Sequence, residues 1–544
     1  MNHSLKVYLI VCARRPVSLK KPERKVNACV DLFLRGRLRL QLPHHFFPSA
    51  TMNQLFSRFL AHHLWLLVFL LIFLQLILVS RLLWDTQPPG LIKPVLRVLA
   101  PESELVHSRI SPFGPGMERE LVELFANRTG VHPVWLHMDE AGTAWDELRR
   151  HRADLLVGFG YAPSRPFLDS LVAPVSAGPV YARHPVGMVH HRQHRPPKDL
   201  AEACRRGLLI PENPALFQTI AHLPYEFAQE RTMAGESRCA APLLTIAEGT
   251  MPRQFAVMST SEARFMLVDT GRFALWEPFF VDLQLAENLD ASLEYRWFWR
   301  DDRNRLAPLL QEFWKDLLHS RELARIQDKY IGFLPESSDR HALLHLLATL
   351  RSELPRYEKT ILKAAQRYDI DPLLLIALIY HESRFDPEAV SRTGVRGIMQ
   401  ITQATARELG LSDPMDARKS ILAGARYLRQ ISNRLDRPDL DEWDRWFLAL
   451  SAYNQGIGHT WDAMALAESL DLKATSWNDV KSVFPLLSQR EYFSNARHGY
   501  TRGFEAVAHV EAIRYYYYVL HGLLVLERPE GEYFGRLGRA GLLS

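Results

Sequence analysis

The spacing of hydrophobic positions changes along this chain of 544 residues, close to residue 357. Between residues 94 and 335, short apolar runs alternate with segments that carry apolar residues at helical spacing. From residue 357 onward almost every segment follows the helical period, without strand-like alternation. Alternating strands and helices are typical of an α/β domain with a largely parallel sheet. The pattern therefore predicts a multidomain chain, with an α/β domain followed by a mainly α domain.

The α/β part is predicted to open with a strand and a helix. The apolar run 96–100 predicts the strand. The segment 114–130 predicts the helix, because apolar residues share one face and a glycine stands where the helix would stop: Met117, Leu121, Leu124, Phe125 and Gly130. A strand at 134–136, a helix at 145–152 and a strand at 155–157 are expected to follow.

The helical part contains one helix that is apolar all round, which is typical of a buried helix. Asp371 suits its N-cap, Pro372 suits its first turn, and residues 373–380 are apolar without interruption. Its far end carries Glu382, and Pro387 stops it. Burial and the negative end of the helix dipole both favour the protonated carboxyl group that a general acid needs. A surface carboxylate that merely ends a helix is the alternative.

Another apolar run, residues 64–79, lies near the start of the chain. At about 1.5 Å per residue it spans roughly 24 Å, short of the roughly 30 Å core of a membrane, and continuation through Trp84 supplies the missing length. Residues 52–90 are therefore predicted to be a signal peptide or a membrane anchor plus a linker, and we favour an uncleaved anchor. Arg58 precedes the run and Asp85 follows it, so the rest of the chain is expected in the cell envelope, facing the periplasm.

Net charge and cysteine usage exclude some classes of partner. The net charge is +5, but residues 1–51 carry ten Lys/Arg against two acidic residues, so the rest of the chain is net negative. That gives no electrostatic reason to expect nucleic acid as a partner. Met52 is an alternative start, and the basic extension 1–51 is given no function. The four cysteines lack the spacing of a metal site, and we predict no metal and no cofactor.

Three motifs of the helical part stand in a fixed order: Glu382-Ser383, Gly397-Ile398-Met399-Gln400 and Ala452-Tyr453-Asn454. Their order and spacing resemble the goose-type-lysozyme-like domain of the soluble lytic transglycosylase family. The agreement continues through residues 485–489 and 499–503 and covers about residues 357–525. The resemblance implies a mainly α, lysozyme-like catalytic domain over residues 357–528, with peptidoglycan glycan strands as its partner.

The resemblance also implies roles for the matched residues. Glu382 would be the acid/base, and Ser383 would orient that carboxylate or the substrate. Four further residues would line the sugar subsites or the cleft wall near Glu382: Met399, Gln400, Tyr453 and Asn454. The amide of Gln400 would face N-acetyl groups. Core packing is the alternative for Met399 and Tyr453.

The implied reaction is a non-hydrolytic cleavage of the β-1,4 bond between N-acetylmuramic acid and N-acetylglucosamine. Glu382 would protonate the bridging oxygen and then take the proton of the 6-hydroxyl, which closes a 1,6-anhydro sugar. A lysozyme-type hydrolase on the same fold is the nearest alternative. It would need a second carboxylate, for which Asp386, Glu388 and Asp413 are nearest in sequence. A catalytically inert wall-binding sensor is the other alternative.

Residues 114–165 resemble the first lobe of the extracellular solute-binding proteins, with Ala153-Asp154-Leu155 where a helix passes into a strand. Residues 178–191 would cross to a second lobe, and residues 262–335 would return. The resemblance implies a two-lobed periplasmic-binding-protein-like α/β domain over 91–335, then a linker at 336–356, with a tail at 529–544. A muropeptide or an amino-acid-like molecule would be its ligand, and an empty α/β scaffold is the alternative. The two resemblances together imply the outer membrane, or an inner-membrane anchor if the N-terminal segment stays uncleaved.

The last predicted helix departs from the family. His509 stands where relatives have a tyrosine that reaches the catalytic carboxylate, and Ala512 replaces an asparagine. His509 either fills the space of the tyrosine or contacts Glu382. In the second case a charged His509 would favour ionised Glu382, and activity would fall on acidification through the titration of the histidine.

Overall fold

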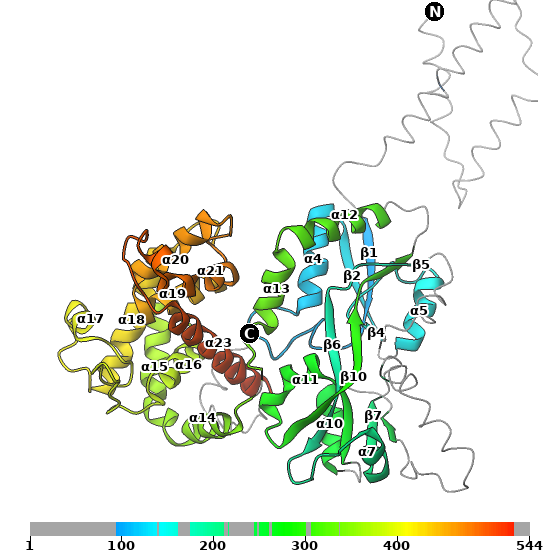
Figure 1. Cartoon of the computed structure of the whole chain (residues 1–544), viewed down its shortest axis with the longest axis horizontal. Coiled ribbons are helices and arrows are strands. Elements are labelled where there is room, and N and C mark those ends of the chain that lie inside the picture. The colour runs from blue at the N-terminus through cyan, green and yellow to red at the C-terminus, as the bar shows by residue number, and fades with distance from the viewer. Residues whose placement is uncertain are drawn as a thin grey trace, which may run out of the picture. The chain divides into compact units, whose positions relative to one another are not determined.

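The computed structural model describes residues 94–138, 141–161, 175–211, 244–246, 250–260, 264–300, 306–336 and 338–526, together with Gln75 and Leu216. The predicted extension 1–51, the predicted tail and nearly all of the predicted anchor segment lie outside these residues. Among the described residues, no helix has the length and apolar character needed to cross a membrane. Residues 92–544 form one compact unit (Figure 1).

The α/β part contains two sheets. The first has the strand order β2-β1-β3-β11-β5, with bounds His132–His137, Val95–Ala100, Leu155–Leu156, Phe298–Arg300 and Val175–Ala177. The helices of this lobe are α4 (Met117–Thr129), α5 (Ala141–Arg149), α12 (Leu306–His319) and α13 (Glu322–Ile331). The strands and helices predicted between residues 96 and 157 are all present, with α5 beginning and ending a few residues earlier than expected.

The second sheet has the order β4-β10-β6-β9-β7-β8, with bounds Gly160–Tyr161, Leu283–Tyr295, Ala182–His191, Phe265–Asp269, Leu208–Pro211 and Leu244–Ile246. Its helical segments are α7 (Leu200–Arg206), α10 (Met251–Thr260), α11 (Thr270–Trp276) and η1 (Glu277–Phe279). The chain passes from β3 in the first sheet to the short β4 in the second, returns to β5, crosses again to β6 and comes back from β10 to β11, so the domain has two lobes, as predicted.

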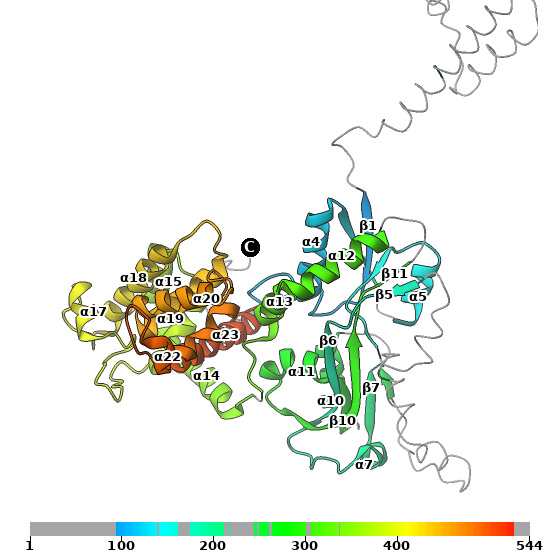
Figure 2. The same ribbon diagram turned by 45° about the horizontal axis from the view of Figure 1, so that its top comes forward.

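The expectation of a largely parallel sheet is wrong for the second lobe. Strand β6 pairs antiparallel with both β10 and β9, and β6 and β10 form a long ribbon that Figure 2 shows side by side. In the first lobe, β1 pairs parallel with β2 and β3, whereas β11 is antiparallel to its neighbours. Most of the antiparallel pairs involve the strands that carry the chain between the lobes, and the hydrophobic spacing within one strand does not show which distant strand will pair with it.

The remaining residues are helical, as predicted. The helices are α14 (Arg340–Ser352), α15 (Leu354–Tyr368), α16 (Pro372–Ser383), α17 (Gln403–Glu408), α18 (Ala417–Leu435), α19 (Glu442–Gln455), α20 (Ile457–Ser469), α21 (Trp477–Val483), η2 (Phe484–Ser488), α22 (Arg490–Phe493) and α23 (Gly503–Leu526). Helix α16 packs against α15 and α23 and is buried from Leu373 to Tyr380, which explains its continuous apolar sequence (Figure 1).

The segment predicted as a linker, 336–356, is not an open connection. Asp339 caps α14 by accepting hydrogen bonds from two backbone N–H groups, and Leu343, Leu346 and Leu350 are buried. The Tyr380 hydroxyl of α16 donates to the Ala342 carbonyl oxygen of α14 at 3.3 Å. Helix α14 therefore supports the helix that carries Glu382.

Helix α23 joins the helical part to the last helix of the α/β part. The guanidinium of Arg514 is fully buried and donates to Asp328 Oδ2 at 3.1 Å and to the Asp328 carbonyl oxygen at 2.8 Å. It also donates to Glu511 Oε2 at 2.9 Å and lies over the Phe447 ring. Nearby, Arg325 of α13 donates to the buried carboxylate of Asp479 at 2.9 Å. Buried charges of both signs are thus paired where α13 contacts α21 and α23.

Candidate active site

Helix α16 places Glu382 at its C-terminal end. Asp371 caps the other end by accepting hydrogen bonds from the backbone N–H groups of Leu373 and Leu374. The helix ends because Arg384 adopts the left-handed conformation, with φ of 54°, and its N–H donates to the Tyr380 carbonyl oxygen. Glu382 thus occupies the last turn, where the partial negative charge of the helix end disfavours a second negative charge.

The carboxyl group of Glu382 has little contact with solvent and few polar contacts with other side chains. Its side chain is 14% exposed, and burial raises its pKa to about 8. No hydrogen bond to this carboxyl group occurs among the described residues, and its oxygen Oε1 lies 3.7 Å from Nε2 of His509. A carboxyl group in this environment holds its proton near neutral pH and has an oxygen free for a substrate.

Two histidines pack beside Glu382. The ring centroids of His381 and His509 are 4.6 Å apart and the rings are nearly perpendicular. Burial lowers the pKa of His381 to about 4, and burial together with His381 lowers the pKa of His509 well below its usual range. Both rings are therefore neutral near pH 7. Of the two alternatives for His509, the low pKa argues against a charged imidazole near neutral pH, whereas its Nε2 does lie 3.7 Å from Oε1 of Glu382.

The tautomer of His509 follows from its neighbours. The amide nitrogen of Asn454 lies 3.5 Å from Nδ1 of His509, and an amide N–H that donates to Nδ1 requires the tautomer with the proton on Nε2. Nε2 has no hydrogen-bond partner among the described residues and lies on the side of Glu382. The structure thus brings together Glu382, Asn454 and His509, which were predicted as site residues.

Sequence reasoning missed His381 as part of this cluster. The residue lies next to Glu382 in the chain, but a histidine at the end of an apolar helix gives no sign of which way its ring turns. Only the packing of α16 against α23 brings it to His509.

The loop between α16 and α17 is tied to two helices. The Ser383 hydroxyl donates to the Ile398 carbonyl oxygen at 2.8 Å, and the Tyr453 hydroxyl donates to the Met399 carbonyl oxygen at 2.8 Å. Gly397 adopts a φ of 89°, and a Cβ atom there would collide with the Pro414 carbonyl oxygen. Ser383 and Tyr453 therefore hold this loop against α16 and α19.

Met399 and Gln400 have limited access to a substrate. The Met399 side chain is fully buried and packs where Gly424 of α18 leaves room for it. The Gln400 amide nitrogen donates to the carbonyl oxygens of Ala389 at 3.1 Å and Gly397 at 2.9 Å. In this conformation Met399 packs in the core, and only the amide oxygen of Gln400 remains for an N-acetyl group.

The candidate second carboxylates of a hydrolase serve local turns. Asp386 accepts a hydrogen bond from the backbone N–H of Glu388 at 2.8 Å, and Asp413 accepts one from Met415 at 2.9 Å. Asp386, Glu388 and Asp413 are exposed. The described residues contain no cluster of three or more metal-ligating side chains.

Comparisons with known proteins agree with this arrangement. Residues 359–475 match the family model of the transglycosylase SLT domain. The membrane-bound lytic murein transglycosylase F of Salmonella arizonae is 32% identical over 80% of this chain and 82% of its own length. The protein of the same name from Salmonella typhi is 32% identical over 80% of this chain and 89% of its own, and that of Nitrosospira multiformis is 29% identical over 74% and 81%.

Solved structures align with less than half of the chain. An ancestral arginine-binding protein bound to arginine covers 44% of this chain and all of its own at 12% identity and a TM-score of 0.36. The ligand-binding core of GluR0 with L-glutamate covers 45% of this chain and all of its own at 9% identity and a TM-score of 0.34. On the sequence identity and coverage of the curated relatives, the chain belongs to the family of membrane-bound lytic murein transglycosylase F.

Proposed function

We propose that this protein is a peptidoglycan lytic transglycosylase in which Glu382 is the single acid/base. One observation carries the proposal. The carboxyl group of Glu382 is buried, without a hydrogen bond among the described residues, and has a pKa of about 8. Such a group is protonated at neutral pH and can deliver its proton to a bridging oxygen.

The reaction needs no external nucleophile. Glu382 protonates the oxygen between N-acetylmuramic acid and N-acetylglucosamine, and the C–O bond to the muramic acid breaks. The acetamido group of the substrate stabilises the oxocarbenium-like centre. Glu382, now ionised, takes the proton of the 6-hydroxyl, whose oxygen closes on the anomeric carbon. The proton returns to Glu382 and no water is consumed, so one carboxyl group completes the cycle.

The residues around Glu382 support this chemistry in different ways. Ser383 and Tyr453 hold the loop at 397–400 in place through hydrogen bonds to its backbone. Neutral His509 presents Nε2–H towards Glu382, and Asn454 fixes that tautomer. These four residues are positioning residues for the acid/base, and the oxygen of Gln400 is the group we assign to an N-acetyl contact.

We propose that the two-lobed domain, residues 91–335, regulates the enzyme by binding a muropeptide or an amino-acid-like ligand. Closure of two lobes around a ligand would move α13, which contacts α21 and α23 through buried charge pairs. Because α23 also carries His509, the movement would reach the residues beside Glu382. The segment 52–90 would hold the protein to a membrane, with both domains in the periplasm.

The decisive test is the product of digestion. Residues 91–544 are incubated with purified cell wall, and the released fragments are analysed by mass spectrometry. Lytic cleavage gives 1,6-anhydro ends, which weigh one water less than the reducing ends that hydrolysis gives. Reducing ends would favour the lysozyme-type hydrolase. No cleavage by the wild type would favour the inert wall-binding sensor.

A further inference from the structure

A row of polar side chains runs from the loop before α23 to the imidazole beside Glu382. The Thr501 hydroxyl donates to Gln455 Oε1 at 2.9 Å, and the Gln455 amide nitrogen donates to Asn454 Oδ1 at 2.8 Å. The amide nitrogen of Asn454 then faces Nδ1 of His509 at 3.5 Å. Each side chain offers its donor to the next one along the row. These four residues are called the relay below.

The outer end of the relay is held by the backbone. Thr501 is buried, and its N–H donates to the Leu487 carbonyl oxygen at 3.3 Å. Asn454 and Gln455 are the last two residues of α19, which ends where Gly456 adopts a φ of 88°. The relay therefore starts from a residue whose backbone and hydroxyl are both bonded, and it continues at a defined helix end.

The order of the donors decides which nitrogen of His509 carries the proton. With its oxygen bonded to Thr501, the Gln455 amide turns its nitrogen to Asn454. The oxygen of Asn454 is then occupied, so its nitrogen faces His509 as a donor and requires the proton on Nε2. Asn454 alone would leave this choice open, because an isolated amide can be placed either way round. Thr501 and Gln455 thus determine the tautomer of a residue that they do not touch.

Nε2 of His509 is a buried donor without a hydrogen-bond partner among the described residues. It lies 3.7 Å from Oε1 of Glu382, which is longer than a hydrogen bond. An unpaired buried donor is costly, and this one gains a partner when Glu382 gives up its proton and becomes a carboxylate. A donor that is already oriented towards the developing charge stabilises the transition state more than the ground state.

Two other titratable groups lie beside Glu382 and remain neutral near pH 7. His381, on the same helix, packs against His509, and burial lowers its pKa to about 4. Tyr453 of α19 lies near Glu382, and burial together with that carboxyl group raises the pKa of its hydroxyl well above the usual range. The orientation of His509 should therefore be visible in the titration of Glu382.

We propose that Thr501 and Gln455 are positioning residues for the proton transfer, because through Asn454 they hold Nε2–H of His509 towards Glu382. The relay stabilises Glu382 while it is ionised, from protonation of the bridging oxygen until the 6-hydroxyl proton is taken up. The inference rests on the proposed function, since it concerns the same acid/base. It extends that function to two residues that were not predicted as site residues.

The test removes the hydroxyl at the outer end of the relay. Thr501→Val keeps the shape of the side chain, and Thr475→Val is the matched control. Thr475 is also buried and donates to Asp439 Oδ2 at 3.1 Å, outside the relay. The cleavage rate on soluble peptidoglycan fragments should fall about three- to tenfold in Thr501→Val, as for the loss of one hydrogen bond, and stay within about twofold in the control.

The pH profile gives a readout that a merely structural role would not move. Without an oriented Nε2–H, ionised Glu382 loses a donor, so its pKa should rise. The loss of activity above about pH 8 should then move upwards by about half a pH unit in Thr501→Val. In His509→Tyr the phenol has no tautomer to fix, so adding Thr501→Val to that variant should have little further effect.

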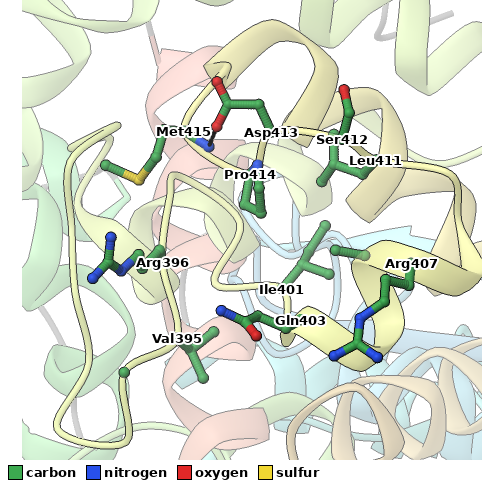
Figure 3. A pocket seen from close by; sticks show the side chains of 12 residues that line it. Val395, Arg396, Ile401, Gln403, Arg407, Leu411, Ser412, Asp413, Pro414 and Met415 are labelled. Atoms are coloured by element: carbon green, nitrogen blue, oxygen red, sulfur yellow. Dashed lines mark hydrogen bonds between the residues drawn. The ribbon is translucent and has the colours of Figure 1, made fainter.

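Gln455→Met breaks the relay at its second bond and should change the rate and the pH profile in the same way, even if Thr501→Val does not fold. Its control is Gln403→Met, because Gln403 lines a pocket between α17 and residues 411–415 to which no relay residue contributes (Figure 3). Relay variants that match their controls would overturn the proposal, as would an equal loss from Thr501→Val in the His509→Tyr background. A wild type that does not cleave peptidoglycan would instead refute the proposed function.

Discussion

Two buried carboxyl groups, one in each domain, have a similarly raised pKa but very different surroundings. Glu118 of α4 is fully buried, and Glu382 of α16 is 14% exposed, yet both have a pKa of about 8. Glu118 receives hydrogen bonds from Trp297 Nε1 at 2.9 Å, from the Tyr181 hydroxyl and from the backbone N–H of Gly158. Burial raises the pKa of Glu118 by more than the bonds from Trp297 and Gly158 lower it. The pKa of Glu382 is raised by burial alone.

The difference separates a structural acid from the acid that we propose to be catalytic. Tyr181 lies between β5 and β6 and Trp297 lies between β10 and β11, so Glu118 ties two of the segments that cross between the sheets to α4. Its oxygens are already bonded and have no access to solvent. Glu382 lacks such donors and keeps partial exposure, so a substrate oxygen can reach it. A raised pKa therefore identifies a proton donor only where the carboxyl group is also free to contact a ligand.

The largest effect should come from removing the acid of Glu382. Glu382→Gln preserves the shape of the side chain but cannot transfer a proton, so wall cleavage should fall roughly a thousandfold. The melting temperature at pH 7 should rise rather than fall, because the unfolded carboxyl group is ionised at pH 7 while the folded one is protonated, and glutamine removes the cost of that difference. Wall cleavage is measured by the release of anhydro ends, and stability is measured by a thermal melt. Activity above a few per cent of wild type in a folded variant would rule out the single-carboxyl mechanism.

Glu118 should behave in the opposite way. Glu118→Ala leaves the Trp297 and Tyr181 donors without their acceptor in a buried cavity, which should cost about 2–4 kcal/mol of unfolding free energy. The folded fraction should still cleave peptidoglycan, since the residue lies outside the helical domain. Chemical denaturation and activity per folded molecule test this. Lost activity at full stability would mean that the lobe crossings control catalysis directly.

Both carboxyl groups should make stability depend on pH. Each has a folded pKa near 8 and an unfolded pKa near 4.5, so the folded state keeps protons that the unfolded state releases between these values. Stability is then greatest below the unfolded pKa and falls as pH rises towards 8, by up to about 1.4 kcal/mol per pH unit for each group. Thermal melts from pH 5 to 9 should show the decline. Glu382→Gln and Glu118→Gln should each make stability decrease less steeply with pH. A variant with the same pH dependence as the wild type would contradict the raised pKa of the residue that it replaces.

The smallest effect on activity should come from replacing His509, which lies beside Glu382. Wild-type activity should be lost as pH rises through about 8, when Glu382 loses its proton. It should show no fall near pH 6.5, because buried His509 stays neutral there. His509→Tyr should keep activity within about threefold, since a phenol can donate as Nε2–H does. Profiles of cleavage rate against pH measure this, and an acidic fall near pH 6.5 that the variant abolishes would restore the charged-histidine hypothesis.

The sequence predicted the class of each domain correctly and proposed a candidate acid/base, but it did not predict the contacts around that residue. The apolar run 373–380 identified a buried helix, and its position identified Glu382. Sequence spacing could not predict that the Gln400 amide donates to backbone carbonyls or that Met399 points into the core, because both depend on how the loop folds back on itself. The helix at 340–352 was expected to be part of a linker, since its short apolar face only becomes evident next to its partner.

The charged contacts of Arg514 have a consequence for the evolution of this architecture. The residue belongs to the last helix of the catalytic domain, and its acceptor Asp328 belongs to the preceding domain. Recombination that replaced the first domain with an unrelated one would leave a buried guanidinium with a lost partner, which is strongly destabilising. The two domains are therefore expected to be inherited as a pair, with changes at Asp328 accompanied by changes at Arg514.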